Sequence, residues 1–377
     1  QSEFYYAPPT GFKSLNTSNL DDPTVTPSEH FDTLTYAGSG SSRSITGLDF
    51  QPDLVWIKDR TTGGSGGFHC IHDSVRGDDG THKYILSSDN TITTDTTYSG
   101  YGVTSFNSDG FSIINGGSLS NDSSRNYVAW NWKESASAGF DIVTYEGDSD
   151  SEGDTQDISH SLGVAPDMII VKARDGRAYN DYYAEDAWYV WHKDLTDGSS
   201  IFLNSNSAEV DYSSYGTEPI SSVGSSTFTV CNSFDSNNYL NDFLNWGDPY
   251  EYYTGDNERY VAYLFSGVEG FSKFGKYTGG SDPFIYTGFK VGFWMVKRID
   301  SSGHWTMFDS ARDAHNLVDH QIEPNYANAE SPNSTKGGDF LSNGFKVRSS
   351  QSEVDASGGT YIYAAFAESP FKHANAR

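Results

Sequence analysis

The chain has very little cysteine, and this excludes a scaffold held together by disulfides. Its 377 residues contain 2 cysteines, Cys70 and Cys231, which lie in different parts of the chain and in unlike local sequences. Small secreted proteins that depend on disulfides carry many more. One bond between the two remains open, but two buried free thiols are the simpler interpretation.

Basic charge, long apolar runs and helical periodicity are also scarce. The chain has 24 Lys and Arg against 51 Asp and Glu, a net charge of −27. Such a surface repels phosphate, so no nucleic-acid partner is expected. No apolar run is long enough to cross a bilayer, so no membrane insertion is predicted. No 3.6-residue pattern lasts beyond one or two turns. No Gly-x-Ser-x-Gly elbow or phosphate-binding loop occurs.

Aromatic and turn-forming residues are abundant instead. Aromatic residues make up 15% of a chain that is only 36% hydrophobic, and there are 38 glycines. Tyr, Phe and Trp favour strands, while Gly, Ser, Asn and Asp supply turns. The composition therefore predicts an all-β protein whose cores are built from aromatic side chains.

The same pattern occurs three times along the chain. Each copy opens with a strand-like segment: Phe31–Gly38, Phe140–Gly147 and Phe271–Gly279. An apolar run with a basic pair follows: Pro52–Arg60, Pro166–Arg174 and Gly292–Arg298. Each copy closes on an aromatic strand: Tyr127–Trp132, Tyr260–Phe265 and Tyr361–Phe366. Repetition at this spacing predicts tandem modules, each large enough to bury its own core.

The repeats predict four segments. Residues 1–30, with their scattered prolines, are expected to form an extended arm or linker. Modules follow at 31–138, 139–269 and 270–377. The middle module is the longest, with additions at 178–186 and 232–254 that are expected to be loops. Turn signals every 8–12 residues or so favour a β-sandwich within each module.

The motifs resemble a known group of proteins. Gly47–Lys58, His72–Gly77 and Tyr127–Trp132 resemble repeat modules of large tailed-phage proteins, especially from marine samples. The ending Tyr361–Phe371 is similar to their usual C-terminus, and Tyr5–Lys13 to the segment that follows an SPRY-like sandwich in them. The resemblance implies concanavalin-like (LamG/SPRY-type) jelly rolls and a virion appendage or surface protein. It carries over no catalytic residues. The third copy departs from the pattern, because it lacks the Pro-Asp step before its apolar run.

An Asp-Ser-x-Arg motif occurs in the first and third copies. It comprises Asp73 to Arg76 and Asp309 to Arg312, whereas the middle copy has Asp194-Leu195 and no Arg. One interpretation is a clamp for a polar ligand. The other, which the missing Arg favours, is a turn in which Asp caps backbone amides and Arg pairs with a carboxylate.

One acidic loop has calcium-loop spacing. Carboxylates alternate and a glycine interrupts them, at Asp148, Asp150, Glu152 and Asp154. Alternate oxygens converge on one cation in loops of this kind. Ser159 stands where the bidentate Glu would be, so a solvated acidic hairpin is the alternative to calcium binding.

Aromatic residues among Asn and Asp in the middle copy are the predicted ligand contacts. They are Tyr182, Tyr183, Trp188, Tyr239, Trp246 and Tyr252. Aromatic faces beside amides and carboxylates suit sugar rings, and they equally suit a protein neighbour. Both partners remain open at this point.

Catalysis is not expected. A glycosidase needs two carboxylates a set distance apart in a cleft, and no acidic residues recur at matching strand positions. His69 and His72 are expected to face one side of a strand, but no further Cys or His pair completes a zinc site.

These features predict a non-enzymatic structural or adhesion protein of a phage particle, virion-bound or extracellular, that binds a host-surface glycan or another virion protein and forms a homo-oligomer. No cofactor other than calcium is implied. The alternatives are a polysaccharide-degrading enzyme on the same scaffold and a subunit of a self-assembling extracellular filament.

Overall fold

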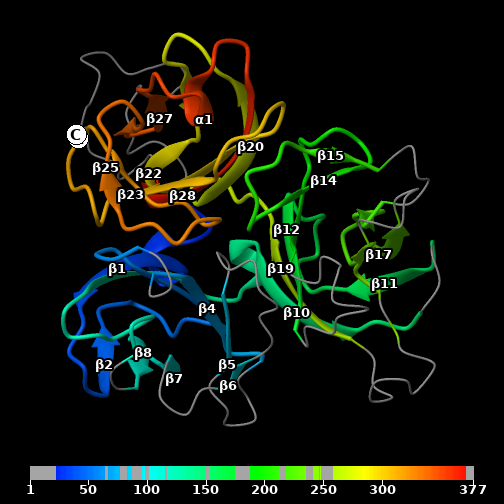
Figure 1. Ribbon diagram of the computed structural model, residues 1–377, viewed down its shortest axis with the longest axis horizontal. Coiled ribbons are helices and arrows are strands. Elements are labelled where there is room, and N and C mark those ends of the chain that lie inside the picture. The colour runs from blue at the N-terminus through cyan, green and yellow to red at the C-terminus, as the bar shows by residue number, and fades with distance from the viewer. Residues whose placement is uncertain are drawn as a thin grey trace, which may run out of the picture.

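The computed structural model describes most of the chain and is all-β, built from antiparallel sheets (Figure 1). The described residues are 23–63, 67–76, 83–86, 96–97, 102–114, 117–149, 153–174, 187–212, 218–234, 241–245, 247 and 258–370. Within them strand pairing stays inside three stretches, called unit 1 (31–132), unit 2 (140–265) and unit 3 (272–370).

Unit 1 has a large and a small sheet. The large sheet has the order β1-β9-β3-β4-β5-β6 and the small sheet β2-β8-β7. Their bounds are β1 Phe31–Ala37, β2 Arg43–Thr46, β3 Leu54–Asp59, β4 His69–Asp73, β5 Lys83–Leu86, β6 Thr96–Thr97, β7 Val103–Asn107, β8 Gly110–Ile113 and β9 Asn126–Trp132. A short 3₁₀ helix, η2 (Pro27–Glu29), precedes them, and another, η4 (Ala136–Ala138), leads to unit 2.

Unit 2 repeats this plan. Its large sheet has the order β10-β19-β12-β13-β14-β15, and its small sheet β11-β17-β16 with β18 paired to β17. The bounds are β10 Phe140–Glu146, β11 Thr155–Ser159, β12 Met168–Ala173, β13 Trp188–His192, β14 Ser199–Phe202, β15 Val210–Asp211, β16 Ile220–Ser221, β17 Thr227–Phe234, β18 Asn241–Phe243 and β19 Arg259–Phe265.

Unit 3 repeats it again. Its large sheet has the order β20-β28-β22-β23, its small sheet β21-β27-β26, and β24 pairs with β25. The bounds are β20 Ser272–Thr278, β21 Phe284–Tyr286, β22 Phe289–Arg298, β23 Thr306–Asp309, β24 His320–Gln321, β25 Ser331–Pro332, β26 Gly338–Leu341, β27 Gly344–Val347 and β28 Thr360–Pro370, with the helix α1 at Ser352–Asp355. None of the helices among the described residues is long and apolar enough to cross a bilayer.

The predicted aromatic closing strand lies between the other two repeated strands in each large sheet. β9 pairs with β1 and β3, β19 with β10 and β12, and β28 with β20 and β22. The sequence repeat therefore corresponds to a repeated strand order. The pairings also give equivalent positions, because Trp132, Phe265 and Phe366 lie opposite Leu54, Met168 and Phe293.

Each unit encloses a core between its two sheets. In unit 1 this cluster includes Val55, Ile57 and Phe111, which come from both the large and the small sheet. Corresponding clusters lie in unit 2, around Phe228 and Leu264, and in unit 3. The prediction that each repeat buries its own core is confirmed. The two cysteines are buried free thiols, as expected.

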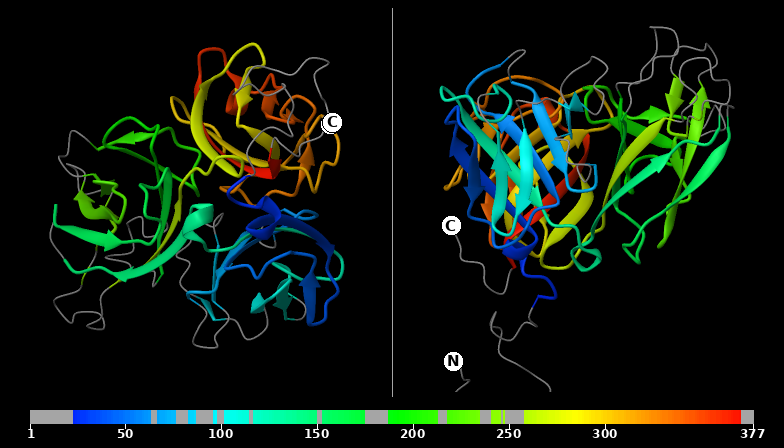
Figure 2. Two further views of the ribbon diagram at one scale, coloured as in Figure 1. Left: turned by 180° about the vertical axis from the view of Figure 1, so that it is seen from behind. Right: turned by 90° about the horizontal axis from the view of Figure 1, so that it is seen from below.

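A further apolar cluster is shared by all three units, which sequence reasoning did not predict. It is formed by the other face of each large sheet, and the arm contributes Val25. Figures 1 and 2 show the three units arranged around a common centre. β3, β12 and β22 are buried on both faces because one face meets the unit's own small sheet and the other meets its neighbours. The units are therefore not independent bodies on a string.

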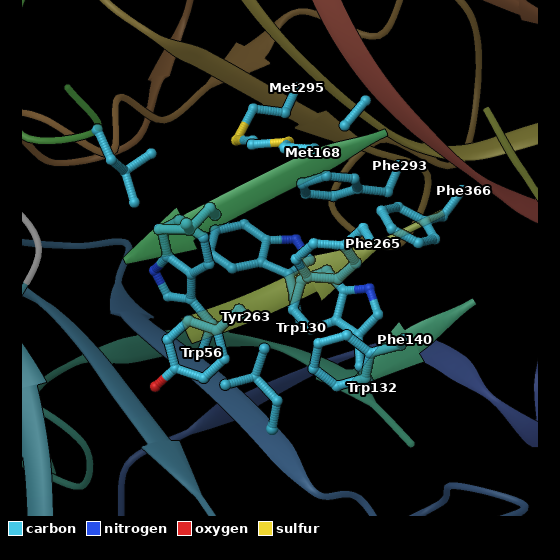
Figure 3. Packing of buried hydrophobic residues seen from close by; sticks show 14 of the residues in the cluster. Trp56, Trp130, Trp132, Phe140, Met168, Tyr263, Phe265, Phe293, Met295 and Phe366 are labelled. Carbon is cyan, nitrogen blue, oxygen red and sulfur yellow. The ribbon is translucent and has the colours of Figure 1, made fainter. Parts of the chain in front are cut away.

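Three equivalent aromatic rings meet at this centre (Figure 3). The ring centroids of Trp132 and Phe265 are 6.3 Å apart, those of Trp132 and Phe366 5.7 Å, and those of Phe265 and Phe366 6.0 Å. All three pairs are edge-to-face, an arrangement that aromatic quadrupoles favour. The units are thus related by an approximate threefold axis.

A small apolar cavity of about 30 Å³ lies beside these rings. Its lining includes Leu54, Met168 and Phe293 together with the ring triangle. A water molecule needs several polar partners, so a cavity of this size and lining is expected to stay dry. It is a packing defect at the axis rather than a ligand site.

An Asp-Gly turn joins β7 to β8 in unit 1, and an Asn-Gly turn joins β26 to β27 in unit 3. Asn107 pairs with Gly110, and Leu341 pairs with Gly344, across the two turns. Gly110 has a φ of +152°, but a positive φ is not the reason for Gly344. A Cβ on Gly344 would lie 2.1 Å from the carbonyl oxygen of Ile285, so close strand approach requires glycine there.

The shared cluster predicts that the three units unfold together. Phe366→Ala removes a ring from the shared centre and should lower the free energy of unfolding by about 3–5 kcal/mol. Because the ring touches units 1 and 2 as well, one transition should persist and move as a whole. Calorimetry and denaturant unfolding measure this, with the exposed Tyr326→Ala as control. Separate transitions, of which only one moves, would contradict the shared core.

Candidate functional site

The Asp-Ser-x-Arg motifs form buried turns. The backbone N–H of Arg76 donates to Asp73 Oδ1 at 2.8 Å, and that of Arg312 to Asp309 Oδ1 at 2.9 Å. Each guanidinium also pairs with the same carboxylate, at 2.6 Å from Arg312 Nε to Asp309 Oδ2. The structural interpretation of the motif, a capped turn with an ion pair, is confirmed.

Each of these carboxylates also accepts a hydrogen bond from another unit. The Tyr263 hydroxyl of unit 2 donates to Asp73 Oδ2 at 2.7 Å, and Trp130 Nε1 of unit 1 donates to Asp309 Oδ2 at 3.0 Å. Tyr263 and Trp130 occupy equivalent positions on β19 and β9. The motif therefore joins unit 2 to unit 1, and unit 1 to unit 3.

The third junction, between units 3 and 2, lacks this arrangement. In the strand register, His192 stands where Asp73 and Asp309 stand, since His192 lies opposite Met168 as they lie opposite Leu54 and Phe293. Ala364 occupies the position of Trp130 and Tyr263. The missing Arg of unit 2 thus coincides with a missing aromatic donor in unit 3.

The basic residue of the apolar run forms a second kind of junction in units 1 and 3. Lys58 Nζ donates to the carbonyl oxygen of Asn328 in unit 3 at 2.7 Å, and Lys297 Nζ to that of Ser207 in unit 2 at 2.6 Å. Lys172, the equivalent residue of unit 2, is also buried. Burial lowers the pKa of Lys58 and of Lys297 to about 8, so both remain largely charged at neutral pH.

Backbone hydrogen bonds join the same pairs of units beside these lysines. The N–H of Glu330 donates to the carbonyl of Arg60 at 3.0 Å, and the N–H of Glu209 donates to that of Ile299 at 3.0 Å. Glu330 and Glu209 each lie two residues after the carbonyl that accepts the lysine. The segments between Phe202 and Glu209 and between Glu323 and Glu330 are therefore matching straps that hold the next unit.

His69 contributes to one of these junctions as a neutral ring. Its Nδ1 accepts from Trp56 Nε1 at 2.8 Å, which leaves Nε2 to donate to the carbonyl of Glu323 at 3.1 Å. Burial, with the Lys58 ammonium nearby, holds the pKa of His69 well below 6.5. The interpretation that His69 and His72 face one side was wrong, because residues three apart on a strand point to opposite faces.

Most of the predicted ligand-binding aromatics lie outside the described residues: Tyr182, Tyr183, Tyr239, Trp246 and Tyr252. Trp188 is described and is wholly buried in the shared cluster, where it lines the central cavity. Trp188 therefore belongs to the core rather than to an exposed loop. The strand β13 begins at this residue, although its sequence neighbours suggested a loop.

The predicted calcium loop is described only in part, since Asp150 and Glu152 lie outside the described residues. Asp148 Oδ1 accepts from Asn245 Nδ2 at 2.8 Å, and Asp154 accepts from the Ser149 hydroxyl. Both carboxylates could still serve as oxygen ligands, and calcium binding stays a prediction.

Another group with metal-ligand chemistry is formed by Asp313, Asp319 and His320. Their ligand atoms lie within 4.8 Å of one another. Asp313 Oδ2 accepts the N–H groups of Asp319 and His320 at 2.8 Å each. The group is half-buried, and its internal hydrogen bonds account for the arrangement without an ion.

A carboxyl pair lies at the connection between units 1 and 2. Burial, and then a hydrogen bond with Asp141, raise the pKa of Glu134 to about 7. Hydrogen-bonded carboxyl groups lie closer together than the roughly 5–9.5 Å that glycosidases require. Neither residue lines the central cavity. Sequence reasoning missed this pair because the two acids lie in different repeats.

The described residues define an all-β protein of antiparallel, sandwich-like sheets whose repeated polar residues join its three units. A model of one protein family, described as a domain of unknown function (DUF7483), matches residues 26–370. The chain belongs to this family. No curated protein and no solved structure matches the chain.

The junction between units 1 and 2 can be tested by removing one hydroxyl. Tyr263→Phe keeps the ring in the shared cluster but leaves Asp73 with one donor fewer, which should cost about 1–3 kcal/mol of unfolding free energy. Denaturant unfolding measures the loss. Tyr326→Phe, at a ring that is 49% exposed, is the matched control. Equal stability of the two variants would contradict a role for the Tyr263 hydroxyl.

Acid should destabilise the junction between units 3 and 2. Burial, and then the Lys193 ammonium, lower the pKa of His192 from 6.5 to about 3. Between these values the unfolded state binds a proton that the folded state does not, so stability falls as the pH falls, by up to about 1.4 kcal/mol per pH unit. His192→Gln should show a shallower decline than the unsubstituted chain in unfolding measured from pH 7 to about pH 4.5. The exposed His315→Gln is the control; parallel curves for all three proteins would refute the assignment.

Proposed function

We propose that this protein is a non-enzymatic structural and adhesion protein of a phage particle, built from three concanavalin-like jelly-roll modules. In this proposal it is displayed on the virion or outside the cell and binds a host-surface glycan or another virion protein. The resemblance of its motifs to tailed-phage modules supports the virion context.

One observation carries the proposal. The repeated motifs that might have formed a ligand site are used between units: the Asp–Arg turns accept Tyr263 and Trp130, and Lys58 and Lys297 hold neighbouring straps. The inner faces of the large sheets are buried against one another. What the molecule offers to its surroundings is therefore the outer faces of the small sheets and the loops beyond them. A protein of this kind is better suited to presenting binding surfaces than to catalysing a reaction.

The charge of the protein and the burial of its inner surfaces also limit which partners it can bind. A net charge of −27 disfavours nucleic acid. Because one chain already supplies three units around an axis, the inner surfaces are not available for self-association. A homo-oligomer, which the proposal retains, would use outer surfaces. Several copies on a particle would then gain avidity for a repetitive host surface.

Binding and turnover assays on the purified full chain test the proposal. We expect retention on an array of bacterial surface glycans or on whole host cells, and no release of reducing sugar from the polysaccharides bound. Heat-unfolded protein is the control for nonspecific adsorption. Absence of binding to both glycans and host cells would reject the adhesion role, and steady release of reducing sugar would favour the enzyme instead.

A further inference from the structure

The outer face of the small sheet differs sharply between the three units. In unit 3 the exposed positions of β21 are Phe284 and Tyr286, whose side chains are 49% and 57% exposed, while Ile285 between them is buried. These are two of the four large hydrophobic residues exposed among the described residues. Isolated exposed apolar side chains are ordinary, but two adjacent rings on one strand face are less so.

The other units provide an internal comparison. Ile285 lies opposite Phe345, as Ile45 lies opposite Phe111 and Ile158 opposite Phe228, so the three strands are in register. The positions equivalent to the two rings are therefore Ser44 and Thr46 in unit 1, and Asp157 and Ser159 in unit 2. The strand folds with polar residues at these positions, so the scaffold does not require aromatic ones.

A glycine lies beneath the two rings. Gly344 lies opposite Tyr286, and Phe284 rests on it, since a Cβ there would lie 3.1 Å from Phe284 Cε2. The two strand positions are about 6.7 Å apart along one face, a spacing on the scale of successive sugar rings. Rings presented in this way offer their faces to a ligand lying along the strand.

Two lysines lie beside the rings. Lys273 Nζ lies 5.4 Å from the centroid of the Tyr286 ring and donates to its carbonyl oxygen at 2.7 Å. Lys346 lies opposite Phe284 on β27. Neither lysine forms an ion pair with a carboxylate of the described residues, although acids outnumber bases two to one in the chain. The carboxylate opposite Lys346, Asp339, instead pairs with Arg348 at 2.8 Å.

The size of this face decides what could bind there. Two rings that are half-exposed offer roughly 200 Å² of aromatic surface, whereas a stable protein interface buries about 800 Å² on each partner. A partner strand is also poorly served, because β21 has three residues and Lys273 already occupies the Tyr286 carbonyl. An extended polymer of small rings fits the size. The chain's net charge of −27 repels polyanions as a whole, but Lys273 and Lys346, which lack ion pairs among the described residues, make this face locally favourable to negative groups.

We propose that the outer face of the unit 3 small sheet binds an anionic polysaccharide, with the rings of Phe284 and Tyr286 stacking on sugar rings and the Lys273 and Lys346 ammonium groups pairing with its carboxylates or sulfates. This inference rests on the proposed adhesion function and assigns it a surface and a class of ligand.

The test uses the full chain and the residues of unit 1 as the replacement. The double variant Phe284→Ser with Tyr286→Thr should lower affinity for alginate and chondroitin sulfate about a hundredfold, since each half-exposed ring contributes about tenfold. Lys346→Gln should weaken binding and reduce its dependence on salt. Val164→Ser, at a side chain that is 51% exposed in unit 2, is the matched control and should bind as the unsubstituted chain does. Thermal unfolding confirms that each variant is folded.

Each result bears on the inference. Dextran, which is neutral, should not bind; equal binding to dextran would overturn the proposed ligand class. If the double variant binds alginate and chondroitin sulfate normally, the surface is wrong while the adhesion function stands. If the unsubstituted chain binds no polysaccharide, the inference falls together with the glycan part of the proposed function. Self-association that the double variant abolishes, without polysaccharide binding, would assign the face to a second copy instead.

Discussion

The triangle of Trp132, Phe265 and Phe366 is the contact on which the rest of the structure depends. Trp132 and Phe265 end β9 and β19, Phe366 lies at the equivalent position within β28, and each ring touches the other two. A sheet that presents an apolar inner face must cover it, and here each sheet is covered by the other two. This shared burial explains why the closing strands are aromatic at both alternating faces, one turned to the unit's own core and one to the axis.

The polar junctions fix how the three units are positioned relative to one another, which apolar contacts at the centre alone would not determine. A buried ion pair adds little net stability, but a buried donor or acceptor without a partner is costly. Asp73 with Tyr263, and Asp309 with Trp130, therefore disfavour slipped arrangements of the units. The junction of units 3 and 2 has His192 and Ala364 in place of this pair, and Lys297 and Glu209 supply its polar contacts instead.

The sequence predicted the strands well because local pattern determines them. The expected segments Phe31–Gly38 and Pro52–Arg60 contain β1 and β3, and Tyr127–Trp132 matches β9 to within one residue. The shared cluster could not be predicted, since a strand apolar on both faces does not reveal what covers the second face. Trp188 was expected in a loop because Asn and Asp surround its segment. The outward rings of Phe284 and Tyr286 could not be recognised, because the run Phe284-Ile285-Tyr286 is apolar throughout and does not show which side chains face solvent.

The three copies are constrained differently on their two sides. Some buried positions keep their character in all three copies. Tyr127, Tyr260 and Tyr361, which lie in the units' own cores, all stack on a tyrosine of the first strand, with centroids 4.9–5.3 Å apart. An outward position of a small sheet affects one unit and contacts solvent, so Ser44, Asp157 and Phe284 can differ freely. Divergence on a repeated scaffold therefore marks where each copy can acquire its own contacts, as the outward positions of β2, β11 and β21 illustrate.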